Sequence, residues 1–318
     1  MIVFVHIPKT AGTSFGKALS SQYGSEKIWY DYSLSFSKTS DPIAEYVHKE
    51  HDMWALKRLA YFKGIRVISG HYPAVRYQSI YCVTEYCTFF RDPVQRVYSE
   101  YCHRKRRSFD RFEGSFEDYC NVKKFCNVQS RHLKGAAWPA FGFLGLTEFY
   151  SESLEMFEGW QGVSLDRVEE NKNTSKKGAA YSLTDDEREI ATETQRQDIT
   201  LYDSAVAYFK ERLKAFRGGH FVVNGQVTIS KEGKVKGFAF FNDSHQGLEH
   251  VAVELLVNGE VVSSLPAKEY RKDLHLIGAP KNGHVGFSKN LPLKPGDVVS
   301  ARVAESGQYL ANGIVKKK

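Results

Sequence analysis

The residues best suited to chemistry lie near the start of the chain, in the segment Pro8-Lys9-Thr10-Ala11-Gly12-Thr13-Ser14. An apolar, β-branched run over residues 2–7 precedes it and predicts a buried strand, and a helical pattern begins at Phe15. A loop between a strand and a helix N-terminus gathers backbone N–H groups, and Lys9 adds a full positive charge. The segment therefore predicts a phosphate-binding loop, in which Gly12 is expected to adopt backbone angles closed to other residues.

A second group of candidate residues follows a predicted strand over residues 86–90 and begins at Arg91. Asp92 can cap the next helix, and Pro93 can occupy its first position. Ser99 lies two helical turns from Arg91, on a different face from the apolar residues of that helix. Arg91 and Ser99 are therefore expected to reach one compact anion together.

These two segments resemble the nucleotide-binding motifs of sulfotransferases that use 3′-phosphoadenosine-5′-phosphosulfate (PAPS). The first is similar to their 5′-phosphosulfate loop, and Arg91, with Ser99 eight residues later, is similar to their 3′-phosphate motif. The resemblance implies that Lys9 stabilises the charge on the leaving group and that Arg91 and Ser99 hold the 3′-phosphate. It also implies that the rest of the loop contacts the phosphosulfate, through Thr10, Ala11, Gly12, Thr13 and Ser14.

A candidate base is His71, which follows a strand predicted over residues 66–69. Ligands bind at the carboxyl ends of strands in open α/β sheets, and imidazole can accept an alcohol proton near neutral pH. The position also resembles that of the catalytic histidine of polysaccharide 2-O-sulfotransferases, although Ser69 stands where those enzymes have another histidine. A glutamate or another histidine remains an alternative base. His6 is expected to face the same region and to orient the loop.

Further likeness covers the first two-thirds of the chain, and the whole is most similar to the branch containing heparan-sulfate 2-O- and uronyl sulfotransferases. Asn127-Val-Gln-Ser-Arg-His-Leu133 resembles a segment of sulfotransferases acting on polysaccharides, which implies substrate contacts for Gln129 and Arg131. Lys177 belongs to a basic loop where that family often adds a nucleotide contact. Arg104 lies in the basic run of residues 103–107, which either faces water at a helix C-terminus or docks an acidic acceptor.

Composition limits the classes of protein that fit the chain. The net charge of +7 over 318 residues favours anionic ligands without the strong basic excess of nucleic-acid-binding proteins. No apolar run reaches the roughly 20 residues of a membrane span, no signal peptide is recognisable, and the five cysteines lack metal-site spacing. The sequence therefore predicts a cytoplasmic protein with reduced thiols, and it carries no sign of oligomeric state.

The pattern of elements predicts an α/β fold in two domains. Residues 1–217 are expected to form a three-layer, P-loop-like parallel sheet flanked by helices, with residues 23–41 as a loop-rich excursion. Residues 220–318 contain short β-rich runs that predict an all-β sandwich. This second domain resembles accessory β-domains of bacterial carbohydrate-modifying enzymes. Asn224-Gly225 and Asn258-Gly259 are predicted hairpin turns.

The expected function is transfer of a sulfuryl group from PAPS to an acceptor hydroxyl, which is expected to belong to a carbohydrate or glycan. Adenosine 3′,5′-bisphosphate would be the second product, and the scheme requires no metal. One alternative is a P-loop kinase or NTPase, although the loop lacks a terminal Gly-Lys-Ser/Thr and no strand-terminal aspartate for magnesium is evident. Another alternative is a glycan-binding protein with an inactive α/β domain.

Overall fold

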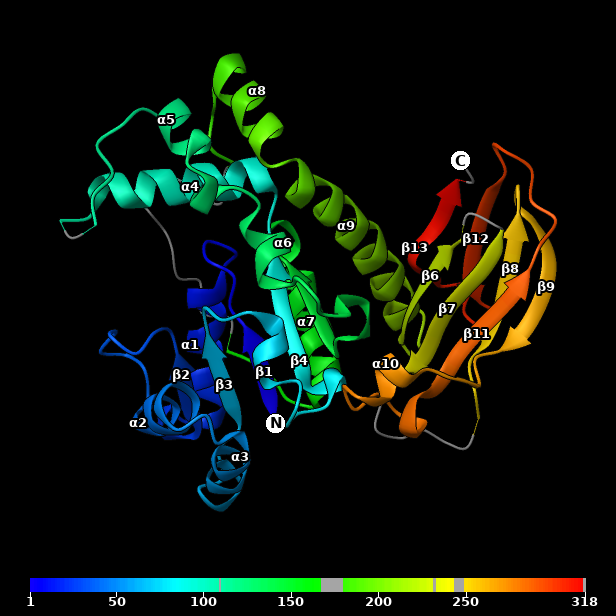
Figure 1. The fold of residues 1–318 in the computed structure, drawn as a ribbon, viewed down its shortest axis with the longest axis horizontal. Helices are drawn as coiled ribbons and strands as arrows, with labels where there is room; N and C mark the ends of the chain where they lie inside the picture. Colours follow the sequence, from blue (N-terminus) through cyan, green and yellow to red (C-terminus); the bar gives the residue numbers. More distant parts are fainter. Residues whose placement is uncertain (109, 167–179, 231–232, 243–248, 317–318) are drawn as a thin grey trace. The chain divides into compact units, whose positions relative to one another are not determined.

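The computed structural model of the protein describes residues 1–108, 110–166, 180–230, 233–242 and 249–316. The chain divides into two compact units (Figure 1). The first unit consists of Met1–Ile80, Cys87–Ala136 and Leu144–Asp203, and the second consists of Tyr81–Tyr86, Ala137–Phe143 and Ser204–Lys318. The second unit thus contains the end of a long helix and two short segments from the first part of the chain, in addition to the β-rich residues.

A five-stranded sheet forms the centre of the first unit, with the strand order β2-β3-β1-β4-β5. The strands are β1 (Ile2–Val5), β2 (Ile28–Asp31), β3 (Val67–Gly70), β4 (Tyr86–Phe90) and β5 (Phe143–Leu146). Both β1 and β2 pair in parallel with β3. Every residue of β1, β3, β4 and β5 is buried, as expected for a parallel sheet covered on both faces. The predicted parallel α/β sheet is therefore present.

Strand β2 lies within residues 23–41, which were predicted to be a loop-rich excursion without a strand of the sheet. Ile28, Trp29 and Asp31 are buried in this edge strand, which pairs with β3 from Ile28 to Asp31. The run is only four residues long and is flanked by polar segments, so it shows no period-2 alternation. Its burial depends on pairing with β3, which lies far away in the sequence.

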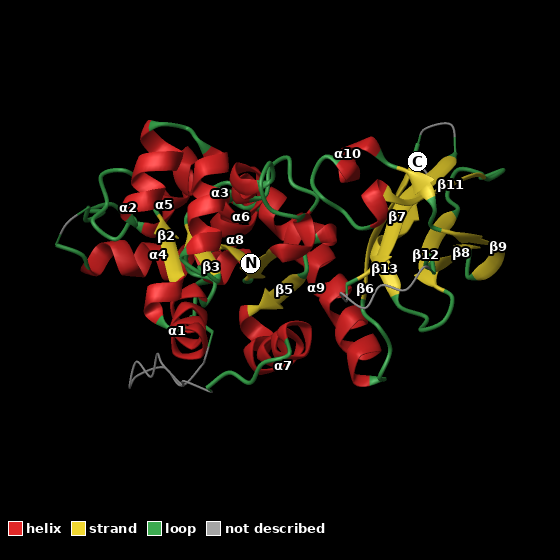
Figure 2. Cartoon of the chain, turned by 90° about the horizontal axis from the view of Figure 1, so that it is seen from below, coloured by secondary structure: helices red, strands yellow, loops and turns green. Residues whose placement is uncertain are grey.

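Helices flank both faces of this sheet. The helices are α1 (Gly12–Tyr23), α2 (Asp41–Ile43), α3 (Met53–Phe62), α4 (Pro93–Arg106), α5 (Phe116–Asn121), α6 (Val128–His132), α7 (Tyr150–Gln161), α8 (Asp185–Thr194) and α9 (Arg196–Arg217). A π-helix, Ala44–Lys49, follows α2. Figure 2 shows α1 and α7 on one face and α3 and α6 on the other.

Two local sequence signals mark helix starts in the structure, and the first of them was predicted. The Asp92 carboxylate accepts a hydrogen bond from the Gln95 amide as the cap of α4, and Pro93 is the first residue of that helix. Thr184 and Glu187 form a capping box at the start of α8. Across the described ranges, no helix combines the length and the apolar character needed to span a bilayer.

The second unit contains a mixed eight-stranded sheet with the order β10-β11-β7-β6-β13-β12-β8-β9. Its strands are β6 (Val223–Ile229), β7 (Lys234–Phe241), β8 (Ala252–Val257), β9 (Glu260–Pro266), β10 (Glu269–Tyr270), β11 (His284–Asn290), β12 (Val298–Val303) and β13 (Tyr309–Lys316), with the short helix α10 (Lys272–His275). Neighbours are antiparallel except β6 and β13, which join in parallel at Gln226 and Ala311. One hydrophobic core collects side chains from both halves of this sheet.

Of the two predicted hairpin turns, one is confirmed and one is wrong. Asn258 and Gly259 have φ angles of 53° and 91° and connect β8 to β9. Asn224 and Gly225 instead lie inside β6. The glycine is needed there for space, because a Cβ atom would lie 2.7 Å from the Phe238 carbonyl oxygen. A close approach between distant segments thus explains a dipeptide that is typical of turns.

Candidate active site

The loop after β1 has an unusual backbone. Lys9 and Ala11 have φ angles of 69° and 64°, in the left-handed region that non-glycine residues rarely occupy. Thr10, between them, is fully buried, and its hydroxyl donates to the Ile7 carbonyl at 2.9 Å. Such strain is found where the surrounding structure enforces it, and it occurs most often at functional sites.

Gly12 serves the loop in a way that the sequence did not indicate. Its φ angle is not positive, so the expectation that it supplies unusual backbone angles is wrong. A Cβ atom on Gly12 would lie 2.0 Å from Cδ2 of His6. Because the imidazole packs directly beneath the loop, the absent side chain provides room for the His6 ring.

The start of α1 offers hydrogen-bond donors to an anion. Within the described residues, no acceptor engages the N–H groups of Gly12 and Thr13, which belong to the first turn of the helix. The Lys9 ammonium likewise has no hydrogen bond or ion pair in this part of the chain. Burial, reinforced by the positive charge of Arg91, lowers the pKa of Lys9. An anion at this point would meet free donors and a partly desolvated positive charge.

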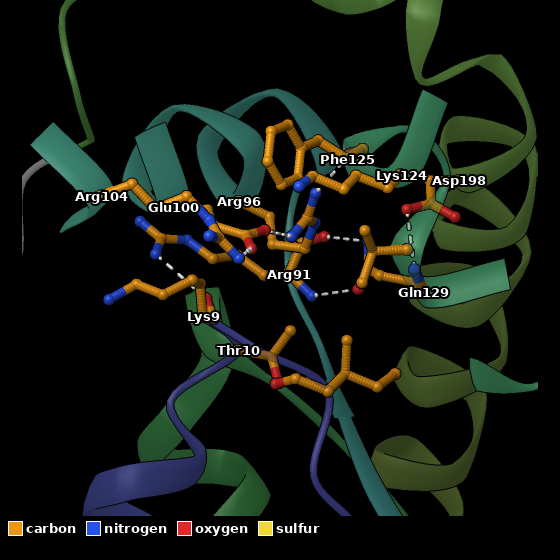
Figure 3. Close-up of polar contacts among 12 residues, drawn as sticks. Lys9, Thr10, Arg91, Arg96, Glu100, Arg104, Lys124, Phe125, Gln129 and Asp198 are labelled. Carbon is orange, nitrogen blue, oxygen red and sulfur yellow. Dashed lines mark hydrogen bonds and ion pairs between the residues drawn. The ribbon is translucent and has the colours of Figure 1, made fainter. Parts of the chain in front are cut away.

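Arg91 joins the end of β4 to this loop. Its guanidinium donates to the Lys9 carbonyl at 3.2 Å (Figure 3). Gln129 binds both sides of the Arg91 main chain, because its carbonyl accepts from the Arg91 N–H at 3.0 Å and its amide donates to the Arg91 carbonyl at 2.9 Å. Burial lowers the pKa of the Arg91 guanidinium. The strand end is therefore held in one orientation before any ligand binds.

A second set of contacts holds Gln129 itself. The Asp198 carboxylate at the start of α9 accepts from the backbone N–H groups of Gln129 at 3.0 Å and Ser130 at 2.7 Å. The Asn127 side-chain carbonyl accepts in turn from the Asp198 N–H at 3.1 Å. Gln129 and Arg131 were both predicted from resemblance as substrate contacts. The carbonyl oxygen and the amide nitrogen of the Gln129 side chain are both bonded to Arg91. Arg131 is exposed and donates to the Lys124 carbonyl at 2.5 Å.

Ser99 and Arg91 share one neighbour, Tyr181. The Ser99 and Tyr181 hydroxyls are 3.5 Å apart, and the Arg91 guanidinium carbon lies 5.8 Å from the centre of the Tyr181 ring. Gln95 fixes the tyrosine, because it accepts from the Tyr181 N–H at 2.6 Å and donates to its carbonyl at 3.1 Å. The structure thus brings Arg91 and Ser99 to the same place. No motif in the sequence identified Tyr181, and Lys177 lies outside the described residues.

His71 is placed with one ring nitrogen free to act as a base. It follows β3 directly, and its Nδ1 lies 2.6 Å from the His6 carbonyl oxygen, so Nδ1 is the protonated nitrogen and Nε2 keeps its lone pair. Its ring contacts His6 at 4.4 Å and Tyr32 at 4.9 Å between centroids. Partial removal from water lowers the pKa of His71, and the hydrogen bond to the His6 carbonyl opposes that shift.

Two further histidines, His6 and His132, lie near this candidate base. Burial holds the pKa of His6 well below its ordinary value, and the positive charges that His71 and His132 can carry lower it further. His132 is the last residue of α6, and its Nδ1 lies 2.8 Å from the Val128 carbonyl oxygen. Burial also lowers the pKa of His132. Sequence reasoning gave His132 no role, because its proximity to His71 depends on where α6 packs. All three imidazoles favour the neutral form.

The basic end of α4 is partly used inside the protein. Arg104 pairs with Glu100 at 3.6 Å and with Asp110, and its guanidinium lies 4.8 Å from the Phe125 ring centre. Glu100 also accepts from the fully buried Arg96 at 2.6 Å. Figure 3 shows these charges above the Lys9 loop. The predicted role of Arg104 in docking an acceptor therefore competes with these internal contacts.

Comparison with known proteins adds no relative. The chain matches no protein-family model, and no curated protein matches it significantly. The likeness to PAPS-dependent sulfotransferases is therefore carried by the quoted sequence segments alone. What the geometry adds is the proximity of the two segments that the sequence predicts to bind anions, and the tautomer of His71.

Proposed function

We propose that the protein is a sulfotransferase that moves a sulfuryl group from PAPS to a hydroxyl group of a carbohydrate or glycan. The observation that carries this proposal is the hydrogen bond from the Arg91 guanidinium to the Lys9 carbonyl at 3.2 Å. It joins two segments whose sequences resemble the two phosphate sites of one nucleotide. Strands β1 and β4, which lead to them, are neighbours in the sheet.

The proposal includes the finer description of the fold. The strand–loop–helix unit of β1 and α1 supports a P-loop-like first unit, because its loop presents unpaired N–H groups at a helix N-terminus. In the second unit, the shared core between the two halves of the sheet supports a sandwich.

The residues present fit the donor nucleotide. Lys9 and the N–H groups of Gly12 and Thr13 would hold the phosphosulfate end, where a compact ammonium can follow the negative charge that develops on the leaving oxygen. Arg91 and Ser99 would hold the 3′-phosphate, which ATP lacks. The scheme assigns charge neutralisation to these groups and therefore requires no metal.

PAPS held by these residues would supply the sulfuryl group to the acceptor oxygen, with adenosine 3′,5′-bisphosphate as the leaving product. The acceptor proton goes to Nε2 of His71, the nitrogen that carries the lone pair. The His6 carbonyl fixes the tautomer and the orientation of the ring. The lowered pKa of His71 keeps the imidazole neutral, and thus able to accept a proton, at neutral pH.

Ligand-induced thermal stabilisation of the full-length protein tests the donor site. Adenosine 3′,5′-bisphosphate at a hundred times its Kd is expected to add about 2.7 kcal/mol of stability, a rise of several degrees in Tm. Adenosine 5′-monophosphate, without the 3′-phosphate, should stabilise far less. Arg91→Ala should remove that difference, whereas Arg58→Ala on the exposed side of α3 should not.

The same measurement separates the alternatives. Stronger stabilisation by ADP with magnesium would favour a P-loop kinase or NTPase and contradict the proposal.

Transfer is then followed with sulfur-labelled PAPS and a panel of glycans, lipids and small alcohols. Label in a glycan with the wild-type protein, and none with Lys9→Ala, is the expected result. Glycan binding by the wild-type protein without any transfer would favour the inactive binding protein instead.

A further inference from the structure

The loop that follows β2 has a defined shape. The Thr39 hydroxyl accepts from the backbone N–H groups of Tyr32 at 3.3 Å and Ser33 at 3.2 Å, and it donates to the Ser33 carbonyl at 2.6 Å. The Ser40 N–H donates to the Tyr30 carbonyl at 2.9 Å, which closes the base of the loop. Residues 32–39 are therefore held by their own hydrogen bonds at the carboxyl end of the parallel sheet.

The base of this loop is tied firmly to the strand that carries His71. Asp31, the last residue of β2, is fully buried and pairs with Gly70 of β3. Its carboxylate accepts three hydrogen bonds of 2.8 Å, from His48, Arg76 and Tyr77. Because this buried carboxylate has three donors, the end of β2 is held against Arg76 and Tyr77, which follow His71 in the chain.

The loop places aromatic rings beside the candidate base. The Tyr32 ring meets the His71 imidazole edge-on, at 4.9 Å between centroids and an interplanar angle of 75°. Phe36 packs against Tyr32 at 5.4 Å and remains 41% exposed, and Leu34 is 54% exposed. An apolar surface thus begins at the imidazole and continues outward to solvent.

Hydroxyl groups alternate with these apolar side chains. Ser33 and Ser35 lie between Tyr32, Leu34 and Phe36 in the sequence, and their hydroxyls are 3.4 Å apart. Within the described residues, the Tyr32 hydroxyl has no hydrogen-bond partner. A pyranose ring has an apolar C–H face and a rim of hydroxyls, so it can use both kinds of group. A flat phenol would use only the rings.

We infer that Tyr32 and Phe36 form the platform on which a sugar ring of the acceptor rests while one of its hydroxyls faces His71. The inference rests on the proposed function and names the part of the chain that recognises the acceptor. It assigns no role in donor binding to this loop, because Lys9 and Arg91 lie at the ends of β1 and β4. Changes in the platform should therefore affect the acceptor alone.

Steady-state sulfation by the full-length protein tests the platform, with a hyaluronan oligosaccharide, a cello-oligosaccharide and a naphthol as acceptors. Phe36→Ala should raise the KM for the sugar acceptor about fivefold, the loss expected for one aromatic contact. Its kcat and its affinity for adenosine 3′,5′-bisphosphate should stay within about twofold. Phe62→Ala, which removes a 74% exposed phenylalanine from α3, is the matched control and should change none of these values.

The outcomes separate the platform from the function that it rests on. An unchanged KM in Phe36→Ala overturns the platform, as does transfer to the naphthol with no transfer to either sugar. Binding of adenosine 3′,5′-bisphosphate with no transfer to any of the three acceptors also counts against it. A wild-type protein that neither binds this nucleotide nor cleaves PAPS contradicts the proposed function itself.

Discussion

The ends of β1 and β4 differ sharply from the ends of β2 and β3. On the first side, the Arg91 guanidinium donates to the Lys9 carbonyl and Gln129 holds the Arg91 main chain, while the Lys9 ammonium has no hydrogen bond among the described residues. On the second side, His71 and Tyr32 meet mainly through ring contacts, with the histidine in its neutral form. Under the proposed function, one side of the sheet would recognise charge, and the other would recognise shape and accept a proton.

The difference has an energetic cause. Lys9 and Arg91 are partly buried cations that form no ion pair among the described residues, so each loses hydration without full compensation. A bound anion would supply that compensation. The His71 side needs none, because a neutral imidazole is less costly to desolvate. The contrast therefore predicts that donor-side changes affect binding and rate most strongly.

Removal of the Lys9 ammonium should have the largest effect. Lys9→Ala is expected to lower kcat for sulfate transfer about a thousandfold, because the charge developing on the leaving oxygen loses its main partner. Rates with sulfur-labelled PAPS give the measurement, with Lys63→Ala at the exposed end of α3 as control. Near wild-type activity in Lys9→Ala would contradict the assignment of charge recognition to this side.

Removal of the base should come next. His71→Gln is expected to lower kcat about a hundredfold. In the wild type, kcat/KM should fall with acid only below the ordinary histidine pKa of about 6.5, because the pKa of His71 is lowered and only the neutral ring accepts a proton. The variant should lose this acid limb, whereas His220→Gln should retain it. An unchanged acid limb of the pH profile in His71→Gln would point to another base. His132, whose pKa His71 helps to lower, would then be the next residue to substitute.

A more modest loss is expected when Arg91 is released from Gln129. Gln129→Leu leaves the Arg91 N–H and carbonyl without these partners, which costs about 1–3 kcal/mol for buried groups. The affinity for adenosine 3′,5′-bisphosphate should therefore fall about tenfold by calorimetry. Gln22→Leu, at an exposed position of α1, should leave the Kd unchanged. Equal affinity in the two variants would mean that Gln129 does not position Arg91.

Stability should respond to the space beneath the loop. Gly12→Ala places a methyl group against the His6 ring and should destabilise the fold by about 1–3 kcal/mol in denaturant titrations. Gly16→Ala is the matched control on the same helix, because nothing lies within 4 Å of its added Cβ atom. The double variant Gly12→Ala/His6→Ala should be less destabilised than the sum of its single changes. Simple additivity would show that the imidazole is not the obstacle.

The smallest effect is a dependence of stability on pH. The pKa of His6 is well below its ordinary value in the folded protein, so below about pH 6.5 the unfolded chain binds a proton that the folded state refuses. Stability should therefore decrease as the pH falls below 6.5, by at most about 1.4 kcal/mol per pH unit for this group. Denaturation midpoints between pH 7 and 5 should show a weaker dependence in His6→Gln. An identical dependence in that variant would assign the effect to other groups.

Local signals in the sequence account for the elements around the candidate site that were predicted correctly. The strand predicted over residues 2–7, the helix predicted from Phe15, which begins three residues earlier at Gly12, and the Asp92-Pro93 cap depend on neighbouring residues. Their hydrogen bonds and backbone preferences are set within a few positions.

The remaining features depend on segments that meet only in the folded chain. Strand β2 forms because β3 is available to pair with it, and Asn224-Gly225 lies in a strand because Phe238 approaches it closely. The two-sided contact of Gln129 with Arg91 and the room that Gly12 leaves for His6 have the same origin. Sequence alone thus determined which residues could bind anions, because charge and local backbone geometry belong to each residue. The tertiary structure decided which of them face one another, because burial and hydrogen bonds between distant residues exist only after packing.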